Sequence, residues 1–198
     1  MILQRQEKNC IAITSSFIKE NKVVIIPTDT VYGFSGLCTA ESSLVSIKKR
    51  DKNKKLIYLI EKSSLALKYI DVPFYLQCEL DFLFSLWPNP LTIIFKSKPA
   101  TIALRCPKDE WLNSLLSHVA SPIFSTSVNI SGMPPMEEIE SIKKEFQKDV
   151  SLIVDAGNIK GISSTIVDAS KRPFKVLRSG SYTVNLDAIS QAPQPQRR

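Results

Sequence analysis

The residues best suited to chemistry lie directly after a short apolar run. Val23-Val24-Ile25-Ile26 consists of β-branched residues and predicts a buried strand. Pro27 ends that strand, because proline has no N–H group to donate to a sheet. The segment Thr28–Tyr32 then places hydroxyl and carboxylate groups where α/β sheets bind ligands, and Gly33 and Gly36 allow a sharp turn or a close approach to a ligand. The alternative is an ordinary turn whose hydroxyls cap the backbone.

Similar polar groups recur where other strands are expected to end. The segment Ser125–Gly132 is dense in short polar side chains, and Gly161–Thr165 repeats the pattern. Arg105 and Arg178 each end an apolar segment. A hydrogen bond from such a cation to an anionic ligand contributes about 1.5–3 kcal/mol. Together these segments predict a site for polyanions and small polar substrates.

Positive charge is concentrated in one segment. The formal net charge of the chain is +7. The segment Lys48–Lys55 holds six cations and one anion, so it alone carries a net charge of +5. Such a run indicates an anionic partner, which could be a nucleotide, inorganic phosphate or RNA. A solvated lysine-rich loop is the alternative.

Several classes of site are excluded. The chain has neither the P-loop pattern nor the G-x-G-x-x-G dinucleotide pattern. Its one histidine, His118, falls in an expected helix, which argues against a Ser-His-Asp hydrolase. Clustered acids for a metal cage are absent from the sequence. The cysteines are scattered and argue against zinc and disulfides: Cys10, Cys38, Cys78 and Cys106.

The apolar segments are short. None reaches the roughly 18 residues that a membrane helix needs, and residues 1–8 lack the apolar part of a secretory signal. We therefore expect a cytoplasmic protein with reduced thiols and no membrane partner.

Helical and extended patterns alternate along the chain, which predicts an α/β fold with a mixed, twisted sheet. The expected helices are residues 7–19, 44–49, 63–70, 76–86, 111–119 and 137–146. The expected strands are residues 23–26, 56–60, 91–95, 101–105, 123–125, 152–154, 165–167 and 174–177. We expect one domain over residues 5–185 and a flexible tail over 186–198, whose end is polar and proline-rich.

An ordered set of motifs resembles the YrdC-type (TsaC-type) threonylcarbamoyl-AMP synthase family between about Asn21 and Ser181. The motifs are Pro27-Thr28-Asp29-Thr30-Val31-Tyr32-Gly33, Lys48-x-Arg50, Trp87-Pro88-x-Pro90-Leu91-Thr92, Arg105-x-Pro107, Ser127-x-Asn129-x-Ser131-Gly132, Ser164-Thr165-Ile166-Val167-Asp168 and Leu177-Arg178-x-Gly180. The resemblance implies the YrdC-like fold, an open mixed sheet flanked by helices with a positively charged concave face.

The resemblance also implies a nucleotidyltransferase reaction. L-threonine, bicarbonate and ATP give L-threonylcarbamoyladenylate, diphosphate and water, and the product supplies a tRNA adenosine next to the anticodon. Mg2+ would come with ATP and be held mostly by the triphosphate, without a metal site on the protein. Downstream tRNA threonylcarbamoyl-transfer proteins are the implied partners, and weak direct RNA binding stays open.

Site roles follow from the motifs that match. The implied threonine contacts are Thr30, Tyr32, Arg105, Ser127 and Ser164. The implied ATP contacts are Lys48, Arg50, Lys54, Thr101, Ser125, Asn129 and Arg178. Lys48 and Arg50 would matter most. The chemistry would rest on positioning and on charge, because two anions must approach each other and the chain lacks a credible nucleophile.

The chain departs from the family pattern at several positions. Lys48–Asp51 stands for the usual Lys-Gly-Arg-Pro, and Lys55 stands for the following proline. Leu59 lies where some members place a polar threonine contact. Asn89 replaces a glycine and the bulkier Val128 replaces an alanine. These changes leave the exact contacts of the basic segment open.

Two competing functions remain at this level. One is a non-enzymatic RNA-binding module, whose binding would depend steeply on salt, although no strip of stacking aromatic residues supports it. The other is a carbamoyl transferase of the hydrogenase-maturation type, which normally adds an acylphosphatase module and zinc-finger cysteine pairs.

Overall fold

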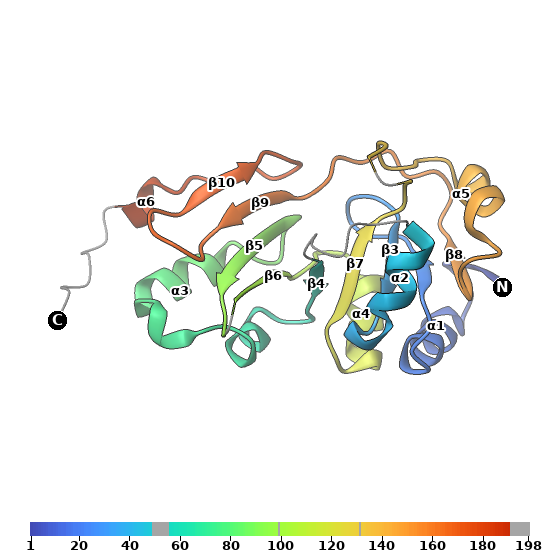
Figure 1. Cartoon of the computed structure of the whole chain (residues 1–198), viewed down its shortest axis with the longest axis horizontal. Coiled ribbons are helices and arrows are strands. Elements are labelled where there is room, and N and C mark those ends of the chain that lie inside the picture. The colour runs from blue at the N-terminus through green and yellow to red at the C-terminus, as the bar shows by residue number, and fades with distance from the viewer. Residues whose placement is uncertain (49–55, 99, 131, 191–198) are drawn as a thin grey trace.

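One mixed sheet of ten strands organises the part of the chain that the structure describes (Figure 1). The structure is a computed structural model, and it describes residues 1–48, 56–98, 100–130 and 132–190. The strand order is β1-β8-β2-β3-β7-β4-β6-β5-β9-β10, with both parallel and antiparallel neighbours. The predicted α/β fold with an open mixed sheet and flanking helices is confirmed. The positive charge of its concave face stays a prediction, as do the domain limits.

The elements largely follow the predicted segments. The strands are β1 (Ile2–Gln4), β2 (Val24–Ile26), β3 (Gly33–Gly36), β4 (Ile57–Leu59), β5 (Leu91–Lys96), β6 (Thr101–Arg105), β7 (Ile123–Ser127), β8 (Leu152–Asp155), β9 (Thr165–Asp168) and β10 (Lys175–Arg178). The helices are α1 (Cys10–Lys19), α2 (Glu41–Lys48), α3 (Gln77–Ser85), α4 (Glu110–Val119), α5 (Ile139–Phe146) and α6 (Asp187–Ser190). Three short 3-10 helices are η1 (Cys38–Ala40), η2 (Ser63–Lys68) and η3 (Val72–Phe74).

Two predictions differ from the structure. Of the two roles predicted for Gly33 and Gly36, the sharp turn is wrong, because both lie in the buried strand β3 between β2 and β7, and the close approach to a ligand stays a prediction. The sequence of β3 shows little alternation of polar and apolar residues, so its pattern did not predict a strand. Glycine is needed at position 33, because a Cβ atom there would lie 2.5 Å from Ser125 Oγ. The helix expected over residues 63–70 is the 3-10 helix η2, a form that proteins use in short pieces.

The two faces of the sheet are covered differently. On the first face, α2 and α5 pack on one half of the sheet and α3 packs on the other, and Tyr58 of β4 contacts both clusters. On the second face, α1 and α4 pack over β1, β8, β2 and the start of β7. Figure 1 shows this division, with α3 beside β5 and β9 and the other large helices around β3, β7 and β8. The remaining part of the second face carries the cavity described below.

The helices in the described ranges are too short or too polar to cross a bilayer.

A buried ion pair fastens the β9–β10 hairpin to α3. Arg172 pairs with the Glu79 carboxylate and also donates to the carbonyl of Phe74 at 2.9 Å. Glu79 accepts a further hydrogen bond of 2.8 Å from the backbone N–H of Leu76, at the start of α3. Its side chain is 6% exposed, so its charge depends on these partners.

We expect Glu79→Ala to lower the free energy of unfolding by about 3 kcal/mol, because the change leaves the Arg172 guanidinium without its partner. Urea titration followed by circular dichroism measures the loss. Asp81→Ala is the matched control on the exposed side of α3 and should change stability by less than about 0.5 kcal/mol. Equal stability of the two variants would contradict the role given to the pair.

Candidate functional site

The cavity lies on the second face of the sheet and has a volume of about 310 Å³. Its floor consists of side chains that share this face because successive residues of a strand alternate sides. The register pairs Leu59 with Arg105, Arg105 with Thr92, and Thr92 with Ile166. A parallel row joins Ser125, Ile57, Ala103 and Ile94. The floor therefore combines apolar side chains with Thr92, Ser125 and Arg105, and Arg105 and Arg178 are the cations among the described residues that line the cavity.

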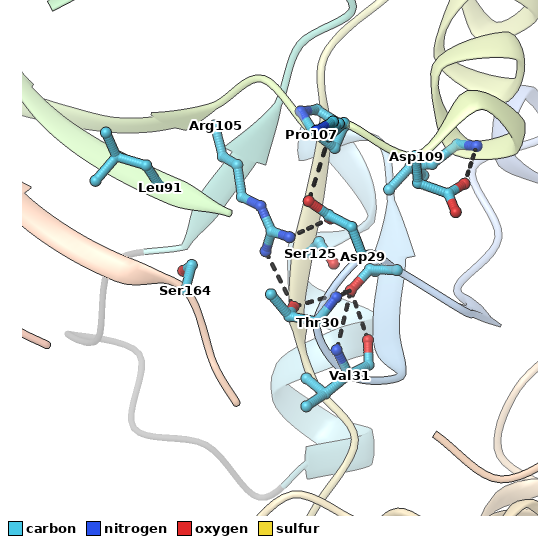
Figure 2. Close-up of polar contacts among 12 residues, drawn as sticks. Asp29, Thr30, Val31, Leu91, Arg105, Pro107, Asp109, Ser125 and Ser164 are labelled. Atoms are coloured by element: carbon cyan, nitrogen blue, oxygen red, sulfur yellow. Dashed lines mark hydrogen bonds and ion pairs between the residues drawn. The ribbon is translucent and has the colours of Figure 1, made fainter. Parts of the chain in front are cut away.

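Arg105 lies at the end of β6 and extends to the loop that follows β2 (Figure 2). Its Nη2 forms an ion pair with Asp29, and its Nη1 donates to Thr30 Oγ1 at 3.1 Å. The third nitrogen, Nε, is buried and has no hydrogen-bond partner. Burial lowers the pKa of Arg105, and the Asp29 carboxylate opposes that shift. A buried N–H group without a partner is costly, so Nε suits an acceptor on a bound molecule.

Thr28 fixes the shape of this loop. Its hydroxyl donates to the carbonyl of Val31 at 2.6 Å and accepts from the backbone N–H groups of Thr30 and Val31 at 3.2 Å each. The Thr30 hydroxyl lies 3.0 Å from the Thr28 hydroxyl. The loop is thus a capped turn that also forms a wall of the cavity, and ligand binding by its hydroxyl groups stays a prediction.

A crossing segment, residues 156–164, joins β8 to β9 and lies against this loop. Figure 1 shows the segment running along the top of the view, from β8 on one side to β9 on the other. Tyr32 holds its start: the hydroxyl accepts from the N–H of Ala156 at 2.9 Å and donates to the carbonyl of Gly157 at 2.7 Å. Burial raises the pKa of Tyr32, so the phenol stays protonated. A Cβ at Gly161 would lie 1.7 Å from the carbonyl oxygen of Thr30, which shows how closely the backbones approach.

Arg178 reaches the cavity because the register of β10 shifts. Val176 pairs with Val167, but the next pair joins Arg178 to Ile166, so Leu177 is an extra residue. Ile166 lines the cavity, and its partner Arg178 lies on the same face. Arg178 donates to the carbonyl of Ser164 through Nε at 3.1 Å and through Nη2 at 2.7 Å. The Ser164 hydroxyl lies 2.9 Å from the hydroxyl of Thr92, also in the cavity.

Lys48 ends α2 beside the end of β7. Its ammonium group donates to the carbonyl of Ser127 at 2.5 Å, to Asn129 Oδ1 at 2.9 Å and to Thr126 Oγ1 at 3.1 Å. Lys48 is 4% exposed and Asn129 is 7% exposed. Both therefore support the cavity wall from behind.

The structure brings most of the predicted residues together. Those that line the cavity are Thr30, Tyr32, Arg105, Ser125, Ser127, Ser164 and Arg178. Lys48 and Asn129 lie behind Ser127, and Thr101 lies two residues from Ala103 at the far end of β6. The predictions for Arg50 and Lys54 fall outside the described residues.

Sequence reasoning gave no role to three polar residues of the site. Thr28 and Asp29 lie within the opening motif, and Thr92 lies in the Trp-Pro-x-Pro-Leu-Thr motif. The sequence shows that Asp29 follows the predicted strand end. It does not show the ion pair of Asp29 with Arg105, because the two residues are 76 positions apart in the chain. The described residues include no group of three His, Cys, Asp or Glu side chains that could hold a metal ion.

Comparisons with known proteins agree on one family. The model of the Sua5/YciO/YrdC family, described as "Telomere recombination", matches residues 16–180. A threonylcarbamoyl-AMP synthase of Pyrococcus abyssi is 29% identical over 195 residues, which are 90% of this chain and 56% of the relative. The protein of the same name from Escherichia coli K12 is 26% identical over 155 residues, covering 71% of this chain and 80% of the relative.

A solved structure shares the fold. The crystal structure of P. abyssi Sua5 complexed with L-threonine superposes with a TM-score of 0.81 at 28% identity and covers 91% of this chain. This chain spans 57% of that structure and 56% of the Pyrococcus sequence.

We expect Gly161→Ala to lower the free energy of unfolding by about 1–3 kcal/mol, because a methyl group there forces the crossing segment away from the Thr30 carbonyl. Thermal and urea unfolding measure the loss. Lys160→Ala changes an exposed neighbour and should leave stability within about 0.5 kcal/mol of the original chain. If Gly161→Ala were as stable as that control, the two backbones would not be in close contact.

Proposed function

Because the chain belongs to the Sua5/YciO/YrdC family, we propose that it is a threonylcarbamoyl-AMP synthase, an enzyme that makes L-threonylcarbamoyladenylate and diphosphate from L-threonine, bicarbonate and ATP. As a nucleotidyltransferase it would supply the modification of a tRNA adenosine next to the anticodon. It would act in the cytoplasm, upstream of proteins that transfer the threonylcarbamoyl group to tRNA.

One observation supports the proposal: the cavity is lined by hydroxyl groups and by the buried guanidinium of Arg105, whose Nε–H has no hydrogen-bond partner in the protein. A guanidinium donor of this kind suits the carboxylate of an amino acid. The neighbouring hydroxyls of Thr30, Ser127 and Ser164 suit the amino and hydroxyl groups of threonine. The Pyrococcus relative whose structure holds L-threonine has the same fold, which supports this assignment.

Arg178 is the cation that we assign to ATP. It lies at the exposed edge of the cavity and uses Nε and Nη2 for the Ser164 carbonyl, which leaves the donors of Nη1 for a phosphate oxygen. Ser125 and Thr101 lie on the same face of the sheet, and Arg50 and Lys54 complete the proposed phosphate contacts.

The reaction then needs positioning more than a protein nucleophile. The amine of threonine condenses with bicarbonate to a carbamate and releases water, and a carbamate oxygen then attacks the α-phosphate of ATP while diphosphate leaves. Both reacting groups are anionic, so fixed cations and N–H donors offset their repulsion. The described donors are hydroxyls and guanidinium groups, which fit anions and not a resident divalent cation, and Mg2+ would therefore enter with the phosphates of ATP.

The direct test supplies the protein with ATP, Mg2+, bicarbonate and labelled L-threonine. We expect diphosphate release that requires threonine, together with a labelled adenylate, measured by coupled assay and by mass spectrometry. A sample that is folded and binds ATP but forms neither product would overturn the proposal. Tight, salt-dependent RNA binding without turnover would favour the RNA-binding alternative.

Arg105→Lys tests the threonine site. Lysine keeps the positive charge but cannot contact Asp29, Thr30 and a carboxylate at the same time, so we expect threonine affinity to fall about 10- to 100-fold. ATP affinity, measured by titration calorimetry on the same sample, should stay within about twofold. Arg5→Lys alters an Arg–Asp ion pair, with Asp109, that does not line the cavity and should change neither affinity. A threonine affinity unchanged in Arg105→Lys would contradict the assignment.

A further inference from the structure

The crossing segment, residues 156–164, forms part of the cavity wall through residues near its end. Ser163 and Ser164 line the cavity, and Gly161 packs so closely on Thr30 that a Cβ would lie 1.7 Å from the Thr30 carbonyl oxygen. The segment is neither helix nor strand, so no regular ladder of hydrogen bonds sets its path. Individual contacts must therefore fix its position, and losing them would move the wall.

Tyr32 supplies two of these contacts at the start of the segment. Its hydroxyl accepts from the N–H of Ala156 at 2.9 Å and donates to the carbonyl of Gly157 at 2.7 Å. A phenol has one proton, and Gly157 engages it, so the Tyr32 hydroxyl has no proton left for a ligand. The ring of Tyr32 lines the cavity, whereas its hydroxyl serves the segment.

Asp155, at the end of β8, supplies a third contact. Its Oδ1 accepts from the N–H of Gly157 at 2.8 Å. Its Oδ2 is held by Lys143 of α5 at 2.7 Å and by Gln4 of β1 at 3.3 Å. Burial alone raises the pKa of Asp155, but the hydrogen bonds to the carboxylate, that of Lys143 foremost, lower the pKa overall. The carboxylate therefore stays ionised, with one oxygen fixed by β1 and α5 and the other aimed at the segment.

The contacts of both side chains converge on Gly157. Its N–H donates to Asp155 and its carbonyl accepts from Tyr32, so both of its backbone groups are engaged. The φ angle of Gly157 is 75°, in the left-handed region that favours glycine. Beyond it, the N–H of Ile159 donates to the carbonyl of Glu137 at 2.9 Å, a contact in which neither side chain takes part. Removing either side chain would thus shift the segment without releasing it entirely.

We propose that Tyr32 and Asp155 are positioning residues for the threonine site, because they fix the start of the crossing segment and so set where its end meets the cavity. This rests on the proposed function and adds residues that act on ligand affinity through the segment. Asp155 itself does not line the cavity. If the segment is displaced in most molecules, the apparent affinity for threonine falls by the fraction that stays competent.

The test measures the L-threonine affinity of the full chain by calorimetry after Tyr32→Phe, which keeps the ring and removes the hydroxyl. We expect the affinity to fall about tenfold. Tyr75→Phe is the matched control, because the hydroxyl of buried Tyr75 also joins a backbone N–H, of Lys96, to a carbonyl, of Ala169, but within the cluster that packs with α3 on the other face of the sheet. It should lose similar stability and keep the threonine affinity within about twofold.

Two variants of Asp155 test the other side chain. Asp155→Ala removes the acceptor for the Gly157 N–H and should weaken threonine binding as Tyr32→Phe does. Asp155→Asn keeps an acceptor oxygen and should restore most of the affinity. Because both side chains act on the same end of the segment, combining Tyr32→Phe with Asp155→Ala should cost less than the product of the two single effects. Hydrogen exchange in residues 156–164 should rise in both single variants and stay unchanged in Tyr75→Phe.

The outcomes separate this inference from the proposed function. Equal threonine affinities of Tyr32→Phe and Tyr75→Phe, in a chain that forms the adenylate, would overturn the inference and leave the proposed function standing. Weaker threonine binding in Tyr32→Phe with unchanged exchange in residues 156–164 would mean that the hydroxyl contacts threonine directly, and it would also overturn the inference. A folded chain that binds no threonine and forms no adenylate would remove the proposed function and the inference with it.

Discussion

The site depends on burying the Arg105 guanidinium in the floor of a sheet. Arg105 is 6% exposed, and an isolated charge at such a position costs several kcal/mol, so the fold must bring Asp29 and Thr30 to it from a distant part of the chain. The registers place the end of β2 at the edge of the sheet where β4 and β6 begin, and the loop after β2 reaches Arg105 at the other end of β6 through Asp29 and Thr30. With two of its three nitrogens hydrogen-bonded, the guanidinium keeps one orientation, and its Nε is left without a partner in the protein.

That orientation is supported by backbone contacts as well as by charge. Thr28 closes the loop on itself, and the crossing segment 156–164 lies on the Thr30 carbonyl from the other side. Tyr32 fixes the start of the segment, and the N–H of Ser181 donates to the carbonyl of Ser163 near its end. A cavity held in this way is formed before any ligand arrives, so less conformational entropy is lost on binding. The same contacts explain why Gly161 cannot carry a side chain.

The sequence predicted the elements better than it predicted their partners. Strong β-branched runs and amphipathic helices located β2, β5, β6 and α4 within one residue or two, because these patterns are local. β3 was missed because Gly33 and Gly36 have low strand propensity, and their reason for being glycine is the approach of Ser125 and Phe124 from another strand. The motifs identified Thr30 and Arg105 as site residues, but the Asp29 ion pair and the shift that turns Arg178 toward the cavity depend on pairing between distant segments.

The described cations of the site differ in how many of their N–H donors the protein leaves available to a ligand. Lys48 and Arg105 are buried, and their donors are mostly engaged by the protein, whereas Arg178 is exposed at the sheet edge. Charges fixed in a low-dielectric wall act on an anion without having to reorganise, so a buried cation still offsets repulsion between two anionic reactants when it does not touch them. In the proposed function, contact at the exposed edge would serve ATP, which must enter and leave. The difference in depth would then assign the floor to the small substrate and the rim to the phosphates.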